Sequence, residues 1–245
     1  MGQKSDNGEV LNVKVAIMQP YFFPYIGYWQ MINAVDQYVV FNDVNYINRG
    51  WINRNRILCQ GKPLYINIPL SKASQNKKIN EIEVIQDKKY FSKLLHTLYD
   101  CYHKAPYFEE TFEFLSNLFN YNTQKQLDLY LLNTIQAICN HLRITTPLIL
   151  SSELPLASDL HGESRIIKIC KLLDGDEYCN AIRGQPLYHR AHFKAEEIAL
   201  YFLKTDPIIY QQFQEKFVEN LSILDMMMFC SKEEIQTMLC SYMLV

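Results

Sequence analysis

The 245-residue sequence lacks several features that would place it in a class at once. It contains no apolar run of the roughly 20 residues that a membrane-spanning helix needs, so no membrane span is expected. Its seven cysteines include no CxxC pair and follow no secretory leader, which indicates reduced thiols and a cytoplasmic protein. The formal net charge of -2 gives no reason to expect a nucleic-acid partner.

The common signatures of catalysis and of metal binding are also missing. No GxSxG motif surrounds a serine, so a serine hydrolase is not expected. His189 and His192 are three residues apart, but no further Cys or His lies at ligand spacing, and we expect no metal. The residues do not decide whether an acyl donor, an aminoacyl donor or ATP serves as a cofactor or co-substrate.

The apolar runs that are present predict an α/β fold. Residues 13–19, 37–42 and 177–182 are short and mainly apolar, as are the strands of a parallel sheet that is covered on both faces. A glycine-containing turn and a helical pattern separate the first two runs, which is the order of a βαβ unit. We expect the three runs to be neighbouring or near-neighbouring strands of one mainly parallel, Rossmann-like sheet.

The periodicity divides the chain into regions. Residues 87–145 show apolar residues at every third or fourth position and predict a helical insertion or subdomain in the middle of the chain. Residues 13–86 and 146–245 are then expected to form the α/β domain. Residues 1–12 are polar and are expected to be a disordered leader.

An aromatic turn, QPYFFPYIGY, follows the first predicted strand. In an open parallel sheet, ligands bind outside the carboxyl ends of the strands, and this turn is expected to lie there. Gly27 at the start of a helix would allow a close backbone approach and would leave amide groups for an anion such as phosphate. A packed turn without a ligand is the alternative. The binding residues predicted in this turn are Gln19, Tyr21, Tyr25, Gly27 and Tyr28.

A cluster of arginine and asparagine side chains follows the second predicted strand. Arginine binds phosphate bidentately, and asparagine amides can bind sugar hydroxyls. A solvated hairpin start is the alternative, although a tryptophan among these residues favours a recognition surface. The binding residues predicted in this cluster are Asn45, Arg49, Trp51, Asn53 and Arg54.

Two later segments complete the predicted site. The segment after the third predicted strand supplies further binding residues, namely Asn180, Arg183, Gly184, Gln185 and Tyr188. The segment LSILDMMMF contains one carboxylate in an apolar run, and a lone buried carboxylate is costly unless it is paired. The candidate catalytic bases are Asp43, His189 and Asp225.

These segments together resemble the WbqC-like family. The resemblance covers nearly the whole chain from residue 13 and is most specific in the motif MQPYFFPYIGYWQMINAVDQYVVFNDVNYINRGWINRNRIL. The stretches PLYINIPL, NAIRGQPLY, QFQEKFVENLSILDMMMF and SKEEI add to it. The family is bacterial and commonly accompanies clusters for surface polysaccharides, among enzymes that make nucleotide-activated amino sugars. Where family members often have two glycines, this chain has Arg183 and Gly184.

The resemblance implies a transferase that modifies a nucleotide-linked amino sugar in surface-polysaccharide (O-antigen, lipopolysaccharide) biosynthesis. The expected reaction is N-acyl or aminoacyl transfer, which forms an amide. Arg49, Arg54 or the helix start at Gly27 would hold the diphosphate, and a base would take the proton of the amine. Enzymes of polysaccharide synthesis are expected partners, and the oligomeric state is left open.

Two alternatives remain at this stage. The turn resembles the HxGH turn of nucleotidyltransferases, which would make the chain an ATP-dependent nucleotidyl or adenylyl transferase. Here Tyr25 and Tyr28 stand where that motif has histidines, so the cationic imidazoles that stabilise charge are missing. The other alternative is a noncatalytic sugar-nucleotide-binding protein.

Overall fold

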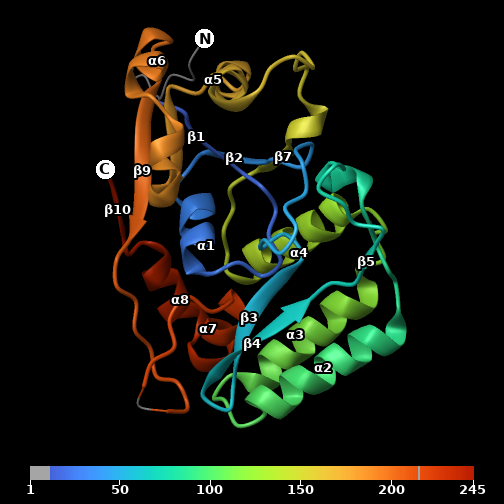
Figure 1. Cartoon of the computed structure of the whole chain (residues 1–245). Helices are drawn as coiled ribbons and strands as arrows, with labels where there is room; N and C mark the ends of the chain where they lie inside the picture. Colours follow the sequence, from blue (N-terminus) through green and yellow to red (C-terminus); the bar gives the residue numbers. More distant parts are fainter. Residues whose placement is uncertain (1–11, 215) are drawn as a thin grey trace.

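A computed structural model describes residues 12–214 and 216–245 as a mixed α/β protein (Figure 1). A six-stranded sheet has the strand order β10-β9-β8-β1-β2-β7. Five of these strands are parallel, and β10 at the edge is antiparallel to β9. The strands are β1 (Lys14–Met18), β2 (Gln37–Val40), β7 (Leu148–Leu150), β8 (Glu177–Ala181), β9 (Ala199–Thr205) and β10 (Tyr242–Leu244).

The order of the strands confirms the prediction for the three apolar runs. The strands β8, β1 and β2 are consecutive and parallel, with Ala16 opposite both Tyr38 and Cys179. From β1 the chain builds β2 and β7 on one side, and then it returns to build β8 and β9 on the other side. The direction of building therefore reverses between β1 and β8, which makes a topological switch point there.

Helices cover both faces of this sheet. Val15 and Ile17 of β1 belong to one apolar core with Ile169 of α5 (Gly162–Leu172) and Phe193 of α6 (Arg190–Ala195). Ala16 points to the other face and belongs to a second, larger core. That core includes α1 (Ile26–Asn33), α4 (Leu127–His141) and α8 (Lys232–Leu239). Burial on both faces explains why the strands read as apolar runs.

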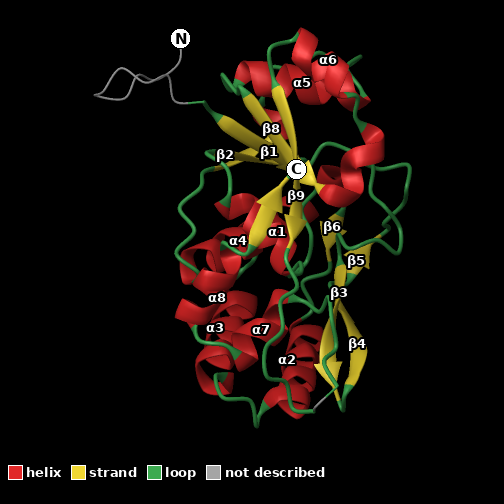
Figure 2. Cartoon of the chain, turned by 90° about the vertical axis from the view of Figure 1, so that its left-hand side faces the viewer, coloured by secondary structure: helices red, strands yellow, loops and turns green. Residues whose placement is uncertain are grey.

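The middle of the chain forms three consecutive helices, namely α2 (Lys88–Tyr102), α3 (Phe108–Tyr121) and α4. Figure 2 shows α2 and α3 beyond the sheet, near α7 (Ile223–Phe229) and the antiparallel hairpin of β3 (Arg54–Cys59) and β4 (Lys62–Asn67). The larger core runs from the sheet into these elements without interruption. A separate insertion or subdomain therefore stays a prediction.

Short elements complete the described part. The strands β5 (Leu70–Ser71) and β6 (Glu83–Val84) pair with each other, and η1 (Ile79–Glu81), η2 (Ser151–Glu153) and η3 (Ile182–Leu187) are 3-10 helices. Residues 1–11 of the predicted leader lie outside the described residues. None of the helices in the described ranges is long and apolar enough to cross a membrane.

Candidate functional site

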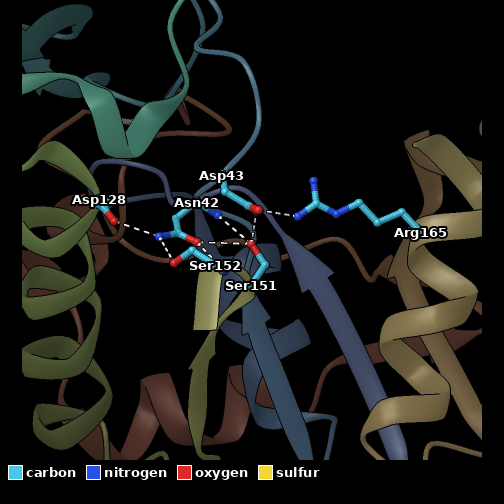
Figure 3. A network of polar contacts seen from close by, with 6 residues as sticks. All are labelled: Asn42, Asp43, Asp128, Ser151, Ser152 and Arg165. Carbon is cyan, nitrogen blue, oxygen red and sulfur yellow. Dashed lines mark hydrogen bonds and ion pairs between the residues drawn. The ribbon is translucent and has the colours of Figure 1, made fainter. Parts of the chain in front are cut away.

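A network of polar side chains lies at the carboxyl ends of β2 and β7. Figure 3 shows α4 on one side of these strand ends and α5 on the other, with the side chains of the network between the two helices. Because β2 and β7 are paired and parallel, the residues after each strand meet at the same edge. The members of the network are Asn42, Asp43, Asp128, Ser151, Ser152 and Arg165.

Asn42 is the centre of this network and is only 1% exposed. Its amide nitrogen donates to Asp128 Oδ2 at 2.7 Å and to Ser152 Oγ at 2.9 Å. Its amide oxygen accepts from the backbone N–H of Ser152 at 3.1 Å, and its own backbone N–H donates to Ser151 Oγ at 3.2 Å. Asn42 therefore fixes the ends of two strands and one helix relative to each other, so it is a positioning residue.

Asp43 sits beside Asn42 and bonds to two donors. Its carboxylate accepts hydrogen bonds from Ser151 Oγ and from a terminal nitrogen of the Arg165 guanidinium. Partial burial alone raises the pKa of Asp43, but these hydrogen bonds and the charge of Arg165 outweigh it and hold the pKa below its ordinary value. Asp43 is therefore ionised at neutral pH, and it is a better counter-ion for a cation than a proton acceptor.

The network has hydrogen-bonding capacity that the described residues do not use. Arg165 lies over the Phe41 ring, 4.8 Å from its centroid, and its Nε is buried without a hydrogen-bond partner among the described residues. Asp128 Oδ1, on the α4 side, is likewise buried without such a partner. Buried polar atoms are nearly always paired, so these two groups are candidates for ligand contacts.

The aromatic turn after β1 divides into a buried part and an exposed part. The Tyr28 ring is 1% exposed, packs against Tyr21 at 5.7 Å between centroids, and donates its hydroxyl to the Gln19 carbonyl at 3.2 Å. Tyr25 is 38% exposed, and its ring covers Gly27, where an added Cβ would lie 2.6 Å from a ring carbon. The Tyr25 ring therefore covers the side of Gly27 to which a Cβ would point, and an anion site at the amide groups of this helix start stays a prediction.

Tyr25 also lines a cavity at the carboxyl end of β9. The cavity has a volume of about 360 Å³, and Thr205, Asp206 and Tyr210 are among its other lining residues. This volume falls within the range of about 300–1,000 Å³ that is usual for small-molecule sites. Burial raises the pKa of Tyr25, while the nearby charge of Arg183 lowers it in part. Arg183 follows β8, the strand that pairs with β9, so it lies at the same carboxyl edge as this cavity.

Part of the predicted arginine and asparagine cluster forms contacts within its own loop. The Arg54 guanidinium donates to the carbonyls of Arg49 and Gly50 and lies 4.8 Å from the centroid of the Tyr65 ring. The Asn53 side chain accepts from a tyrosine hydroxyl at 2.8 Å and donates to a backbone carbonyl at 3.2 Å. These contacts give Arg54 and Asn53 a role in shaping the loop.

The remaining members of the cluster face outward. Trp51 is 40% exposed and stacks on Tyr65 at 6.4 Å between ring centroids. The side chains of Asn45 and Arg49 are exposed, and Asn45 forms an isolated bridge with Lys78. The aromatic turn and the arginine cluster meet where the Phe22 N–H donates to the Trp51 carbonyl at 3.1 Å. A cleft shared by their side chains stays a prediction.

The loop after β8 is organised around Asn180. The Asn180 side chain donates to the hydroxyls of Tyr178 at 2.7 Å and Tyr188 at 3.0 Å, and a Cβ on Gly184 would lie 3.0 Å from its oxygen. Asn180, Gly184 and Tyr188 thus stabilise the loop, while the side chains of Arg183 and Gln185 are exposed. Arg183 does not have a positive φ, so an arginine at this position needs no strained backbone.

The other two candidate bases lie elsewhere. Asp225 of α7 is fully buried and accepts from Tyr102 Oη at 2.7 Å, Tyr210 Oη at 2.6 Å and Gln212 Nε2 at 2.8 Å. Burial raises the pKa of Asp225, and these hydrogen bonds oppose the rise only in part. His189 is exposed and precedes α6. Only Asp43 of the three lies in the polar network, and the pattern of the sequence did not identify its partners Ser151 and Arg165.

The fold and the site define an α/β protein with a charged polar network at the carboxyl edge of a mainly parallel sheet. The chain belongs to the WbqC-like protein family, whose model matches residues 19–237. This match confirms the resemblance found in the sequence.

One curated relative extends the comparison. The chain is 27% identical over 216 residues to the uncharacterized protein Rv1507c of Mycobacterium tuberculosis (strain ATCC 25618 / H37Rv), with 87% of this chain and 92% of that protein covered. No solved structure matches the chain significantly.

Proposed function

We propose that the chain binds a nucleotide-linked amino sugar along the carboxyl edge of its sheet and transfers an acyl or aminoacyl group to the sugar's amino group, in bacterial surface-polysaccharide (O-antigen) biosynthesis. The observation that supports this most is the ionised Asp43 carboxylate, which is held by Ser151 and Arg165 at the edge where open parallel sheets bind ligands. A carboxylate in this position suits the ammonium group of an amino sugar.

The strand order supports a nucleotide as the carrier of the sugar. Building of the sheet reverses between β1 and β8, and Rossmann-like domains bind nucleotides at such a switch point. In this proposal the nucleoside enters the cavity beside Tyr25 and Arg183 binds the diphosphate. Neighbouring strands are about 4.8 Å apart, so β2 lies about 14 Å along the edge from β9, and a ligand with three parts can extend over this distance.

The chemistry assigns a definite part to Asp43. In amide formation the ammonium group first loses one proton to water, because a protonated nitrogen has no lone pair. The amine nitrogen then bonds to the carbonyl carbon of the donor, the bond to the leaving group breaks, and the nitrogen loses a second proton. The lowered pKa of Asp43 makes it a weak base, so its part is to hold and orient the ammonium group. The leaving group gains the electron pair and accepts the second proton.

A noncatalytic sugar-nucleotide-binding protein is the second candidate. The observation that favours it is that two of the three candidate bases are already engaged, Asp225 with three side-chain donors and Asp43 with Ser151 and Arg165. Both candidates use the same binding edge, and they differ only in whether a donor reacts there.

Isothermal titration of a UDP-linked amino sugar tests the binding edge. We expect Arg183→Lys to weaken binding by about 1–3 kcal/mol, because lysine lacks the planar guanidinium that binds a diphosphate bidentately. Arg143→Lys is the matched control, since Arg143 is exposed in the segment between α4 and β7, before the amino end of that strand. Wild-type affinity in the Arg183 variant would show that this loop does not bind the diphosphate.

Mass spectrometry then separates the enzyme from the binding protein. The amino sugar nucleotide is incubated with acyl-CoA, or with ATP and a carboxylic acid, and the enzyme is expected to add the acyl mass to the sugar. Asp43→Asn should abolish this product. Tight binding without any product would favour the noncatalytic candidate.

A further inference from the structure

Three side chains outside the polar network form a cluster that has the composition of a metal site. They are Glu163 in the first turn of α5, His189 immediately before α6, and His192 in α6. One ligand atom from each residue lies within 4.8 Å of the corresponding atoms of the other two. We propose that Glu163, His189 and His192 bind a divalent transition-metal ion such as Zn²⁺ or Co²⁺.

The fold brings the three residues together from two helices. The helices α5 and α6 pack on the same face of the sheet and lie side by side in Figures 1 and 2. His189 and His192 are neighbours because they are three residues apart at the start of α6. Glu163 precedes His189 by 26 residues. This separation explains why the spacing of the histidines alone predicted no metal.

The carboxylate is held in place before any metal binds. Glu163 Oε1 accepts the backbone N–H of His189 at 2.6 Å, and Oε2 lies 2.7 Å from His192 Nδ1 and 3.4 Å from His189 Nδ1. The Glu163 side chain is 16% exposed, whereas the imidazoles of His189 and His192 are 71% and 63% exposed. A partly buried, anchored carboxylate with two exposed imidazoles is a preorganised set of ligands.

The chemistry of the set favours a metal over a simple ion pair. Two imidazoles and one carboxylate are ligands for Zn²⁺ and neighbouring divalent ions, and a site with three protein ligands leaves a position open. The imidazole centroids are 5.0 Å apart beside a single carboxylate, so both rings and the carboxylate can offer ligand atoms to one ion. Ligands of a tetrahedral zinc ion are about 3.5 Å apart, so small side-chain rotations complete the site.

The open position faces a groove. Glu163 and His192 line a groove of about 500 Å³ together with Lys168. Glu163 and Arg165 are two residues apart on α5, so they point in different directions, and the cluster is separate from the Asp43 network. The metal site is therefore independent of the proposed transferase function, and His189 serves it as a ligand.

Titration with Co²⁺ tests the site directly. Protein without a histidine tag, carrying Cys240→Ser to remove an exposed thiol, is stripped with EDTA and titrated while its visible absorption is recorded. We expect one equivalent of Co²⁺ to bind with ligand-field bands and without a thiolate charge-transfer band. His189→Ala and His192→Ala should each weaken binding by about tenfold or more, since even outer-shell changes cost 10–100-fold.

His96→Ala is the matched control. His96 is exposed on α2, and Asp100, at 3.6 Å, is its one carboxylate partner among the described residues. Both replaced histidines of the cluster are exposed, so their variants should fold, and circular dichroism checks this. The proposal is overturned if the parent protein binds no stoichiometric Co²⁺, or if folded His192→Ala binds it as tightly as His96→Ala does.

Discussion

Asp43, after β2, forms an ion pair with Arg165 of α5, a residue that lies 122 positions later in the chain. Both side chains are mostly buried, with 17% and 12% of their surfaces exposed. The pair joins the carboxyl end of a central strand to the helix that leads from β7 to β8. A charged contact at this edge serves both stability and ligand binding, and the two roles can be measured separately.

The contribution of this pair to stability should depend on pH. Asp43→Asn leaves Arg165 without its carboxylate, so we expect the free energy of unfolding at pH 7 to fall by about 1–3 kcal/mol. The pKa of Asp43 in the folded protein lies below the unfolded value of about 3.9, so the stabilisation is present above that pH. It is lost as the pH falls through the folded pKa.

Urea denaturation from pH 7 down toward pH 3 measures this dependence. The difference between wild type and Asp43→Asn should shrink at the acid end. Asp100→Asn is the control, because Asp100 is exposed and should change stability by less than about 0.5 kcal/mol. A difference that stays constant over the whole range would show that the charge of Asp43 is not what stabilises the fold.

Tyr102 should contribute strongly to the stability of the fold. Its hydroxyl donates to Asp225 and accepts the backbone N–H of Leu58 at 2.7 Å, and all three groups are buried. Tyr102→Phe leaves two buried polar groups without this partner, so we expect a loss of about 2–4 kcal/mol in the free energy of unfolding. Tyr121→Phe, at a residue that is 81% exposed, is the control and should be nearly neutral. Equal midpoints in urea for both variants would contradict the structural role.

The effect of Gly27→Ala on the free energy of unfolding should reverse its sign when the Tyr25 ring is removed, and a double-mutant cycle measures this. A Cβ at Gly27 meets the Tyr25 ring at 2.6 Å, so Gly27→Ala should cost about 1–3 kcal/mol through displacement of the ring. In a Tyr25→Ala background the same change should stabilise by up to about 1 kcal/mol, since alanine favours helix more than glycine does. Urea denaturation of the four proteins measures the coupling. An equal cost in both backgrounds would rule out the contact with Tyr25.

Much of the sheet could be predicted from local patterns. The runs around Val15, Val39 and Tyr178 are apolar because helices cover both faces, and this burial leaves a direct signal in the sequence. The place of β7 at the edge had no such signal. Its pairing with β2 joins residues more than a hundred positions apart, and a pairing over such a separation leaves no mark in the local pattern.

The site was predictable only in part. Asp43 follows a strand, so its place at the carboxyl edge could be inferred, and the structure puts it there. Arg165 appears in the sequence as one basic residue of an amphipathic helix, and nothing in its surroundings indicates a partner so far away. The contacts of Arg54 could not be predicted from the sequence, because an arginine that is suited to phosphate can equally bind the carbonyls of its own loop.

The most direct test of the proposed function is a thermodynamic cycle of one residue against one ligand group. Isothermal titration measures the affinity of wild type and Asp43→Asn for a UDP-linked amino sugar and for the same sugar nucleotide with a hydroxyl in place of the amine. We predict that wild type prefers the amine by about tenfold or more and that Asp43→Asn loses this preference, a coupling of about 1–3 kcal/mol. Equal preference for the amine in both folded proteins, or no binding of either ligand, would contradict the assignment of Asp43 and of the carboxyl edge.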